Sequence, residues 1–370
     1  MLFRNSFLFN SSRDRDNDVT VVPRDLVGQP PMLSSAAQFN RSKHRCLNIQ
    51  KKIQITAKMS PPAVTSIDIA SLPLVAKGKV RELYTISDST LLMAVTDRIS
   101  AYDVILSTGI PDKGAILCQI SAHWFSVLSE KVPDLKHHVL SLNPPMAPQI
   151  VSPAERAALR GRCMQIRSLK VFPVEAIVRG YITGSAWAEY KKSGTVHGMP
   201  QPAGLQWSQK FPGGPIYTPS TKAPAGESDE NISPEQARHI VGDKYADKIE
   251  SLALRLYSAA HEYALDKGIV LADTKFEFGL DEETDEVILV DEVLTPDSSR
   301  FWPAPVQVGQ DQPSFDKQYL RNWLTETGKK GKQGVELPDD IVLKTRQLYG
   351  DIFQRLTGKT LEQSLAALDN

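Results

Sequence analysis

The chain has 370 residues, of which 41% are hydrophobic and 23% charged, a composition typical of a globular protein with one large or two medium domains. Its 43 Lys and Arg residues balance 43 Asp and Glu residues, so no overall field favours nucleic acid or a membrane surface. Three scattered cysteines argue against a disulfide scaffold or a zinc cluster, and no run of about 18 apolar residues predicts a membrane-spanning helix.

Residues 1–58 differ from the rest of the chain. They contain six arginines and four lysines against four aspartates, which gives this segment a net charge of +6. An Arg- and Ser-bearing leader predicts an organelle transit peptide, here interrupted by Asp14, Asp16 and Asp18. The alternatives are a disordered tail and a second start at Met59 that would give a shorter, cytosolic form.

From Leu72 the pattern becomes that of a folded domain. Short apolar runs bounded by turn residues predict strands, and a longer run with helical spacing predicts a helix that Pro133 ends. Ser152, followed by Pro153 and Glu155, predicts the start of a short capped helix. We therefore expect strands at 79–86 and 90–95, a helix at 114–132, a helix after Ser152, and strands at 162–169 and 173–182.

The second half begins with a Pro- and Gly-rich segment at 208–232 that lacks apolar periodicity. A loop of about 25 residues is uncommon in a compact domain and is usually functional or disordered. Beyond it, Ser233 with Gln236 predicts a helix start, and Gly268 predicts a helix end. We expect helices after Ser233 and at about 245–267, strands within 269–291, and helices near 314–326 and 339–367.

Two alternating runs, 273–279 and 286–292, flank the turn-rich sequence LDEETD and predict a hairpin. Asp273, Lys275 and Glu277 would share one face because strand side chains alternate. Glu277 would then lie opposite or diagonal to Asp291, while the other face would pack Phe276 and Phe278 against Ile288 and Val290.

Two carboxylates on rigid strands suit Mg²⁺, which takes one or two carboxylates together with phosphate oxygens and water. The alternative is an exposed strand face on which Lys275 neutralises its neighbours. The turn that follows, residues 296–300 with Asp297 and Arg300, adds groups that recognise anions and hydroxyls.

Three further stretches could bind anions. In AKGKVRELY, residues 76–84, Gly78 lets backbone amides approach an anion, although the spacing is not that of a Walker loop. TDRISAYD, residues 96–103, gathers charges at a strand end, and Gly184-Ser185 opens a helix after Arg179. The structural alternatives are a solvated basic strand, a turn with a local ion pair, and a simple N-cap at Ser185.

No Ser-His-acid arrangement is evident, so a hydrolase with a side-chain nucleophile has little support. Taken together, GKVRELY, TDRISAYDV, PVEAIVRGYITGSAWAEY, TPSTKA…DENIS, ADTKFEFG and DEVLTPDSSRFW resemble the SAICAR synthetase family, over about residues 72–345. Ser228 departs from the histidine expected there. The resemblance implies an ATP-dependent ligase that joins L-aspartate to an imidazole carboxylate in purine synthesis, and the leader resembles that of plastid-targeted members.

The resemblance also implies residue roles. The ATP phosphates would be covered by Gly78, Lys79 and Arg81 and approached by Lys222 and Lys275. Catalysis would depend on Lys275, Asp273 and Arg300, and Mg²⁺ would be held by Glu277 and Asp291. The substrates would contact Ser100, Arg179, Ser185, Asp229, Asp297 and Arg300.

Strands before helices in the first half and a hairpin-centred second half predict an α+β fold. The resemblance implies two lobes with ATP in the cleft between them, similar to kinase and ATP-grasp architectures. Residues 59–176 would form the β-rich lobe and 177–370 the larger α/β lobe. We expect small-molecule substrates and neither a nucleic acid nor a membrane as partner. We expect the protein in the plastid stroma or, if translation starts at Met59, in the cytoplasm. A monomer and a homo-oligomer both remain compatible with the sequence.

Two other functions compete with this one. A small-molecule kinase would use the same phosphate clamp but would form ADP without aspartate. A nucleotide-binding protein without catalysis would have no need to keep the acids and cations of the hairpin together.

Overall fold

The computed structural model describes residues 61–144, 151–222 and 228–368, which belong to one structural unit, Ile55–Asn370. The leader and Met59 lie outside these ranges. Within them, no helix combines the length and the apolarity needed to cross a membrane.

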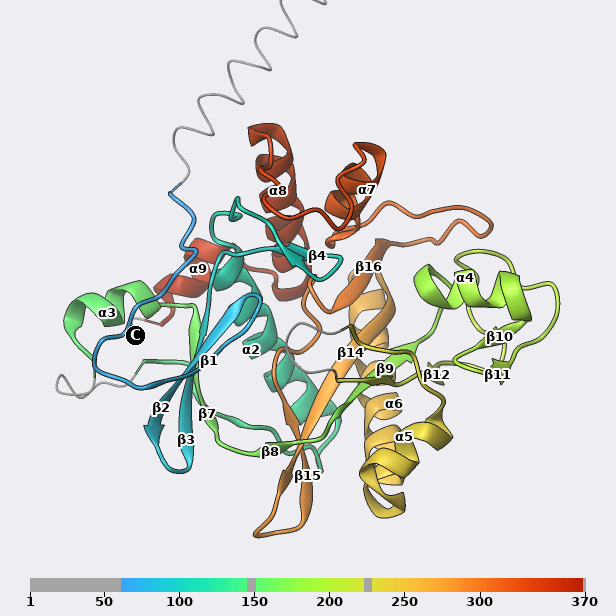
Figure 1. Ribbon diagram of the computed structural model, residues 1–370, viewed down its shortest axis with the longest axis horizontal. Helices are drawn as coiled ribbons and strands as arrows, with labels where there is room; N and C mark the ends of the chain where they lie inside the picture. Colours follow the sequence, from blue (N-terminus) through green and yellow to red (C-terminus); the bar gives the residue numbers. More distant parts are fainter. Residues whose placement is uncertain (1–60, 145–150, 223–227, 369–370) are drawn as a thin grey trace, which may run out of the picture. The chain divides into compact units, whose positions relative to one another are not determined.

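The first half of the chain builds a five-stranded antiparallel sheet (Figure 1). The predicted hairpin is confirmed, and its second strand is buried between neighbours on both sides because it is almost wholly apolar. In sheet order the strands are β1 (Leu74–Lys77), β2 (Arg81–Ser87), β3 (Thr90–Val95), β7 (Cys163–Arg167) and β6 (Val139–Ser141).

The second half builds a seven-stranded antiparallel sheet around one long strand, β14 (Ile269–Asp281). Its first part lies between β9 and β16, and its last part lies between β15 and β8. The other strands are β8 (Lys170–Val171), β9 (Val174–Arg179), β12 (Ile216–Tyr217), β13 (Ser220–Thr221), β15 (Glu286–Val290) and β16 (Ser299–Pro303). The lobe boundary expected at residue 177 falls inside β9.

Two small ribbons complete the strands of the described residues. The first joins β4 (Ser100–Ala101) to β5 (Val104–Ile105), and the second joins β10 (Thr195–Val196) to β11 (Met199–Pro200). β12 and β13 both lie within the predicted 208–232 loop, which therefore contains two short strands that pair with β9.

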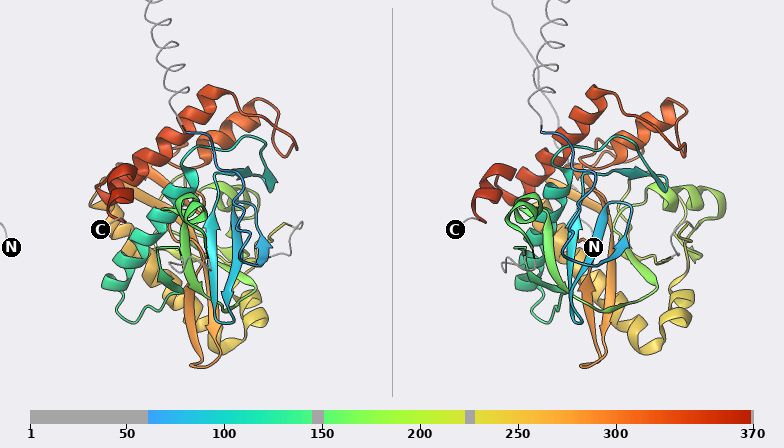
Figure 2. Two further views of the ribbon diagram at one scale, coloured as in Figure 1. Left: turned by 90° about the vertical axis from the view of Figure 1, so that its left-hand side faces the viewer. Right: turned by 60° about the vertical axis from the view of Figure 1, so that its left-hand side comes forward.

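Two long helices, α2 and α6, pack on the two sheets. α2 contacts β3 and β7 of the first sheet as well as α6 and α8, and Figure 2 shows it against the strands. α6 covers β9 and β14 of the second sheet. The helices are α2 (Lys113–Lys131), α3 (Pro153–Leu159), α4 (Gly184–Ser193), α5 (Pro234–Val241), α6 (Asp243–Leu265), α7 (Gln318–Glu326), α8 (Asp339–Thr357) and α9 (Leu361–Ala366).

Local capping chemistry sets several helix ends as predicted. Ser152 and Ser233 each form a capping box, with Glu155 and Gln236 respectively. The expected helix over 339–367 is instead two helices, because Gly358 takes a left-handed conformation (φ 72°) and ends α8. Ser185 is not an N-cap: Thr183 holds that position in α4.

One hydrophobic core joins the two sheets through α2. It contains Trp124 of α2, Met164 of the first sheet and Phe276 of the second, all fully buried. This mixture of antiparallel sheets and packed helices confirms the predicted α+β class.

Candidate active site

The candidate site is built on β14, because alternate side chains of a strand point to the same face. Asp273, Lys275 and Glu277 form ion pairs on one face, while Phe276 and Phe278 are buried in the core on the other. The predicted division of the two faces is therefore confirmed.

The hairpin register differs by one residue from the expected pairing of the phenylalanines. Glu277 pairs with Val290, and Phe278 pairs with Leu289 rather than with Ile288 or Val290. Asp291 follows the strand with φ 64°, so the backbone turns there instead of extending the ladder. The turn still leaves Asp291 close enough to Glu277 for the two charges to interact.

At one end of the site, two arginines share one aspartate. Asp273 pairs in the sheet with Arg179 of β9 on one side and with Arg300 of β16 on the other. Both arginines form ion pairs with its carboxylate, and Arg179 Nη1 lies 3.0 Å from Asp273 Oδ2. Burial, reinforced by Arg300 and opposed by Asp273, lowers the pKa of Arg179. Two guanidiniums share one carboxylate as their direct partner, so they could also bind an anion.

The N-terminus of α4 adds to this cationic end. Arg179 Nη2 donates to Ser185 Oγ at 3.3 Å, and the Arg300 guanidinium lies against Gly184. A Cβ at residue 184 would stand 2.5 Å from Arg300 Nη2, so only glycine allows this approach. Two guanidiniums, a hydroxyl and the start of a helix therefore converge, as a phosphate group requires.

Two residues further along β14, acids and lysines alternate. Lys275 Nζ lies 2.5 Å from Glu175 Oε1 and 3.4 Å from Glu277 Oε1, and Lys222 also pairs with Glu277. Burial would raise the pKa of Glu277, but Lys275 and Lys222 lower it to about 2. Burial would lower the pKa of Lys275, yet Glu277 and Glu175 raise it above its ordinary value. Glu277 and Lys275 are therefore both charged at neutral pH.

Arg81 lies among carboxylates. Its guanidinium is 3.0 Å from Asp291 Oδ2 and 3.3 Å from Glu292 Oε1, and the charge of Glu277 also acts on it. Burial, together with Glu277 and Glu292 and against the attraction of Arg81, raises the pKa of Asp291 to about 6. Asp291 is thus the carboxylate of this group whose charge is hardest to maintain.

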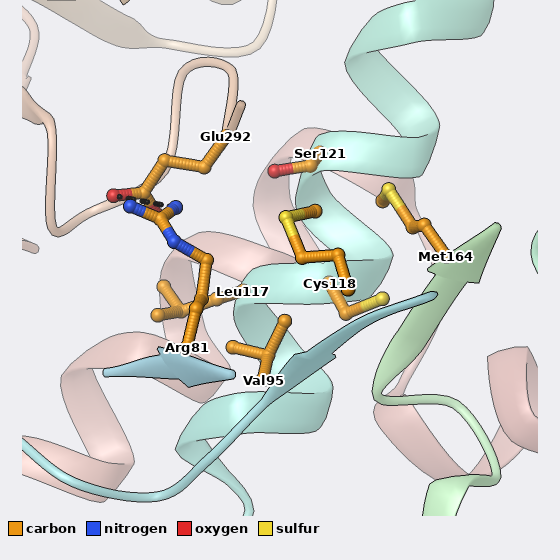
Figure 3. Close-up of a pocket in the computed structure, with 8 residues that line it drawn as sticks. Arg81, Val95, Leu117, Cys118, Ser121, Met164 and Glu292 are labelled. Carbon is orange, nitrogen blue, oxygen red and sulfur yellow. Dashed lines mark ion pairs between the residues drawn. The ribbon is translucent and has the colours of Figure 1, made fainter. Parts of the chain in front are cut away.

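A small cavity lies behind this pair (Figure 3). Arg81 and Glu292 bound one side, and Ser121 of α2 stands across from them. The rest of the wall is apolar or sulfur-bearing: Met93, Val95, Leu117, Cys118 and Met164. The cavity belongs to the packing between α2 and the first sheet rather than to the charged face of β14.

The predicted metal ligands, Glu277 and Asp291, offer two oxygen-donor groups whose charges repel each other. That repulsion is what a divalent cation would relieve, and two carboxylates are the number that Mg²⁺ takes beside phosphate oxygens. Among the described residues, no group of three or more His, Cys, Asp or Glu side chains could hold a metal ion by itself. The donor set fits a metal that shares its ligands with a nucleotide.

Asp297 lies in a buried cluster of its own partners, although its charge also acts on Arg81. Its carboxylate is 2.8 Å from Lys113 Nζ and 3.1 Å from Lys317 Nζ, and it accepts from the Tyr349 hydroxyl at 2.6 Å. Burial opposes its charge, but the two lysines hold the pKa of Asp297 well below its usual range. Its side chain is only 4% exposed, so these three partners take up the carboxylate.

Hydrogen bonds to its backbone stabilise the predicted glycine turn. Gly78 donates to the carbonyl of Arg81 at 2.8 Å, and Arg98 donates to the carbonyls of Gly78 and Lys79. Lys79 pairs with Asp103 at 2.5 Å, next to the ribbon in which Ser100 faces Ile105. Gly78 and Lys79 therefore form a second group, which Asp103 links to the ribbon that carries Ser100.

Sequence reasoning missed several members of the site, above all Glu175, which binds Lys275 and accepts from Ser220 Oγ at 3.0 Å. A carboxylate inside the apolar run PVEAIV was the available signal, because charged residues are rarely buried without a partner. Asp229 is exposed, and its charge acts on Glu175, which places it near this group. Thr218, whose Oγ1 accepts from Arg179 Nε at 3.1 Å, carried no such signal.

Comparison with known proteins agrees with this geometry. The sequence profile of SAICAR synthetase matches residues 74–338. Phosphoribosylaminoimidazole-succinocarboxamide synthase from Pichia angusta is 54% identical over 294 residues, which cover 78% of this chain and 96% of that protein, and the Saccharomyces cerevisiae enzyme is 52% identical.

Solved structures agree as well. The S. cerevisiae SAICAR synthase in complex with SAICAR matches with a TM-score of 0.72 and 50% identity, over 80% of this chain and 98% of that one. A type-2 SAICAR synthetase in complex with ADP matches with a TM-score of 0.57 and 25% identity, over 78% of this chain and 99% of that one.

An antiparallel α+β fold that sets paired arginines beside alternating acids and lysines is that of an enzyme acting on phosphorylated, anionic small molecules. With these relatives, the enzyme is an ATP-dependent carbon–nitrogen ligase of purine synthesis. The chain belongs to the SAICAR synthetase family.

Proposed function

We propose that this chain uses ATP and Mg²⁺ to join L-aspartate to the carboxylate of 5-amino-1-(5-phosphoribosyl)imidazole-4-carboxylate, giving SAICAR, ADP and phosphate. One observation carries the proposal: a single face of β14 presents the arginine pair around Asp273 and, two residues further, the charged row of Lys275 and Glu277. This spacing would place a phosphorylated substrate beside a phosphoryl-transfer site.

The chemistry needs no protein nucleophile. A carboxylate oxygen of the imidazole substrate attacks the γ-phosphorus of ATP, and ADP leaves. The amine of aspartate then attacks the carbonyl carbon of the acyl phosphate, inorganic phosphate leaves, and the new amide nitrogen loses a proton. Catalysis is mainly positioning and charge neutralisation, which agrees with the many cations and the lack of a triad.

The arginine end would hold the imidazole substrate. Arg179, Ser185 and Arg300 would bind its phosphate, with Asp273 fixing both guanidiniums and Ser100 nearby. The structural relative bound to SAICAR supports a ligand of this class. Asp229 and Asp297 were also predicted to contact substrate, and for Asp297 the structure offers a different role, argued below.

The acid–lysine end would hold the nucleotide, with Gly78, Lys79 and Arg81 over its phosphates and Lys222 and Lys275 beside them. The relative bound to ADP supports this class of ligand. Glu277 and Asp291 would hold Mg²⁺, which when bound would neutralise phosphate charge. Lys275 would orient the reacting carboxylate against the γ-phosphate.

An omission experiment tests the proposal. Purified full-length protein is incubated with ATP, Mg²⁺, aspartate and the carboxylated ribotide, and each component is left out in turn. We expect ADP and SAICAR to form in equal amounts only in the complete mixture. Rapid ADP formation without aspartate and a stable phosphoester product would identify a kinase, and nucleotide binding without any turnover would identify a sensor.

We further propose that residues 1–58 direct the enzyme to the plastid, and that neither a nucleic acid nor a membrane is a partner. The basic leader supports the first proposal, and the balance of positive and negative charge over the whole chain supports the second. Fusing residues 1–58 to a fluorescent protein should give plastid fluorescence in plant cells, whereas a fusion that begins at Met59 should stay in the cytosol. Cytosolic fluorescence from the first fusion would exclude the transit function.

A further inference from the structure

Lys222 shares the carboxylate of Glu277 with Lys275, a cation that has a second carboxylate partner. Glu277 already pairs with Lys275, which lies two residues away on the same face of β14 and bridges to Glu175 at 2.5 Å. Lys222 is a second cation on Glu277 and comes from outside the strand, just beyond β13. Its side chain is 38% exposed, against 7% for Glu277, so Lys222 reaches the carboxylate from the solvent side.

The segment that carries Lys222 is attached to the strands at its base. Ser220 of β13 pairs with Glu175 in the ladder and donates to its carboxylate at 3.0 Å. The backbone amide of Lys222 donates to the carbonyl of Pro173 at 3.1 Å. The backbone near Lys222 is therefore fixed, and its long side chain alone can move between partners without unfolding the strand.

Glu277 cannot serve this lysine and a metal ion fully at the same time. A divalent cation that takes the carboxylate oxygen must push away the ammonium, both by competition for the lone pairs and by repulsion between like charges. A polyphosphate arriving with the metal would give the displaced ammonium a new anionic partner within reach.

We propose that Lys222 is an exchangeable cation that occupies Glu277 in the nucleotide-free enzyme and moves to the nucleotide's phosphates when the metal takes its place. The inference rests on the proposed role of Glu277 as a metal ligand. Its consequence is a linkage: the metal alone competes with Lys222 and binds weakly, and a nucleotide raises metal affinity by removing the competitor. The coupling is reciprocal, so metal must raise nucleotide affinity by the same factor.

Direct metal binding tests the exchange without any turnover. Mn²⁺ binding to the full chain is followed by the electron paramagnetic resonance signal of free Mn²⁺, with and without ADP, for the parent and for Lys222→Met. We expect Lys222→Met to bind Mn²⁺ alone about tenfold more tightly, since one competing charge has gone. We expect it also to bind ADP more weakly and to lose most of the ADP-induced gain in Mn²⁺ affinity.

Lys170→Met is the matched control. It removes the same charge from a strand of the second sheet, but Lys170 is 74% exposed and its ion pair is with Glu282 at 3.5 Å, so its Mn²⁺ affinity should equal that of the parent. Unchanged or weaker Mn²⁺ binding in Lys222→Met, beside a parent that binds Mn²⁺ with ADP and makes SAICAR, would overturn the exchange and leave the proposed function standing. Loss of Mn²⁺ binding in the parent itself, with ADP present, would overturn both.

Discussion

The surroundings of Asp291 disfavour the ionised form of its side chain. Burial, Glu277 and Glu292 raise its pKa to about 6 despite the attraction of Arg81. Between about pH 4 and pH 6 the folded protein holds a proton at Asp291 that the unfolded chain releases, so stability falls as the pH rises through this window. Above it the full cost is present, and it falls on the carboxylate that we propose as a ligand of Mg²⁺.

Asp291→Asn should therefore stabilise the protein while abolishing ligase activity. At pH 7 we expect a gain on the order of 2 kcal/mol, seen as a melting temperature a few degrees higher, because Asn carries no charge to bury. The gain should shrink towards pH 4, where the parent's Asp291 is itself protonated, and activity should be lost at every pH. A variant that melts below the parent at pH 7 would mean that the ion pair with Arg81 outweighs the repulsion.

At the scale of elements, the junction between β9 and α4 decides how the arginine pair is presented. Gly184 begins α4 with φ 55°, and its missing side chain leaves room for the Arg300 guanidinium from β16. Gly184→Ala should add a backbone cost of about 1 kcal/mol and push Arg300 away from the helix start. We expect the KM for the ribotide to rise at least tenfold, with a smaller change in the KM for ATP.

The other end of the same helix supplies the control for this variant. Gly194 caps α4 in the same left-handed region (φ 71°), but a Cβ there would meet nothing within 4 Å. Gly194→Ala should lower the melting temperature by a similar amount and leave both KM values unchanged. If the two variants behave alike in steady-state kinetics, the position of Arg300 does not depend on Gly184.

Over the whole molecule, the sequence predicts what is encoded locally. Capping boxes and the alternation of faces along β14 depend on neighbours within a few residues, and the structure has them as expected. The partners of the charged groups lie far apart in the chain, as Glu175 and Lys275 do, and no local pattern specifies them. The left-handed backbone conformation of Asp291 could not be predicted either, because residues other than glycine rarely adopt it.

Asp297 shows why distant partners matter, since its cluster joins four parts of the molecule: the turn after β15, the start of α2, the residue before α7, and α8. Lys113 is fully buried and Lys317 nearly so, and burial, with the repulsion of Lys113, lowers the pKa of Lys317 to about 8. The carboxylate of Asp297 opposes this shift and is the counter-charge of both lysines.

Asp297→Asn should consequently destabilise the protein by about 3–5 kcal/mol, because it leaves buried ammonium groups without a counter-charge. Tyr349→Phe, which removes only a hydrogen bond to the same carboxylate, should cost about 1 kcal/mol. Adding Lys113→Met to Asp297→Asn should restore part of the stability, a coupling that urea denaturation at pH 7 can measure. If Asp297→Asn keeps its stability and instead raises the KM for the ribotide or for aspartate, the carboxylate contacts substrate, as the sequence alone predicted.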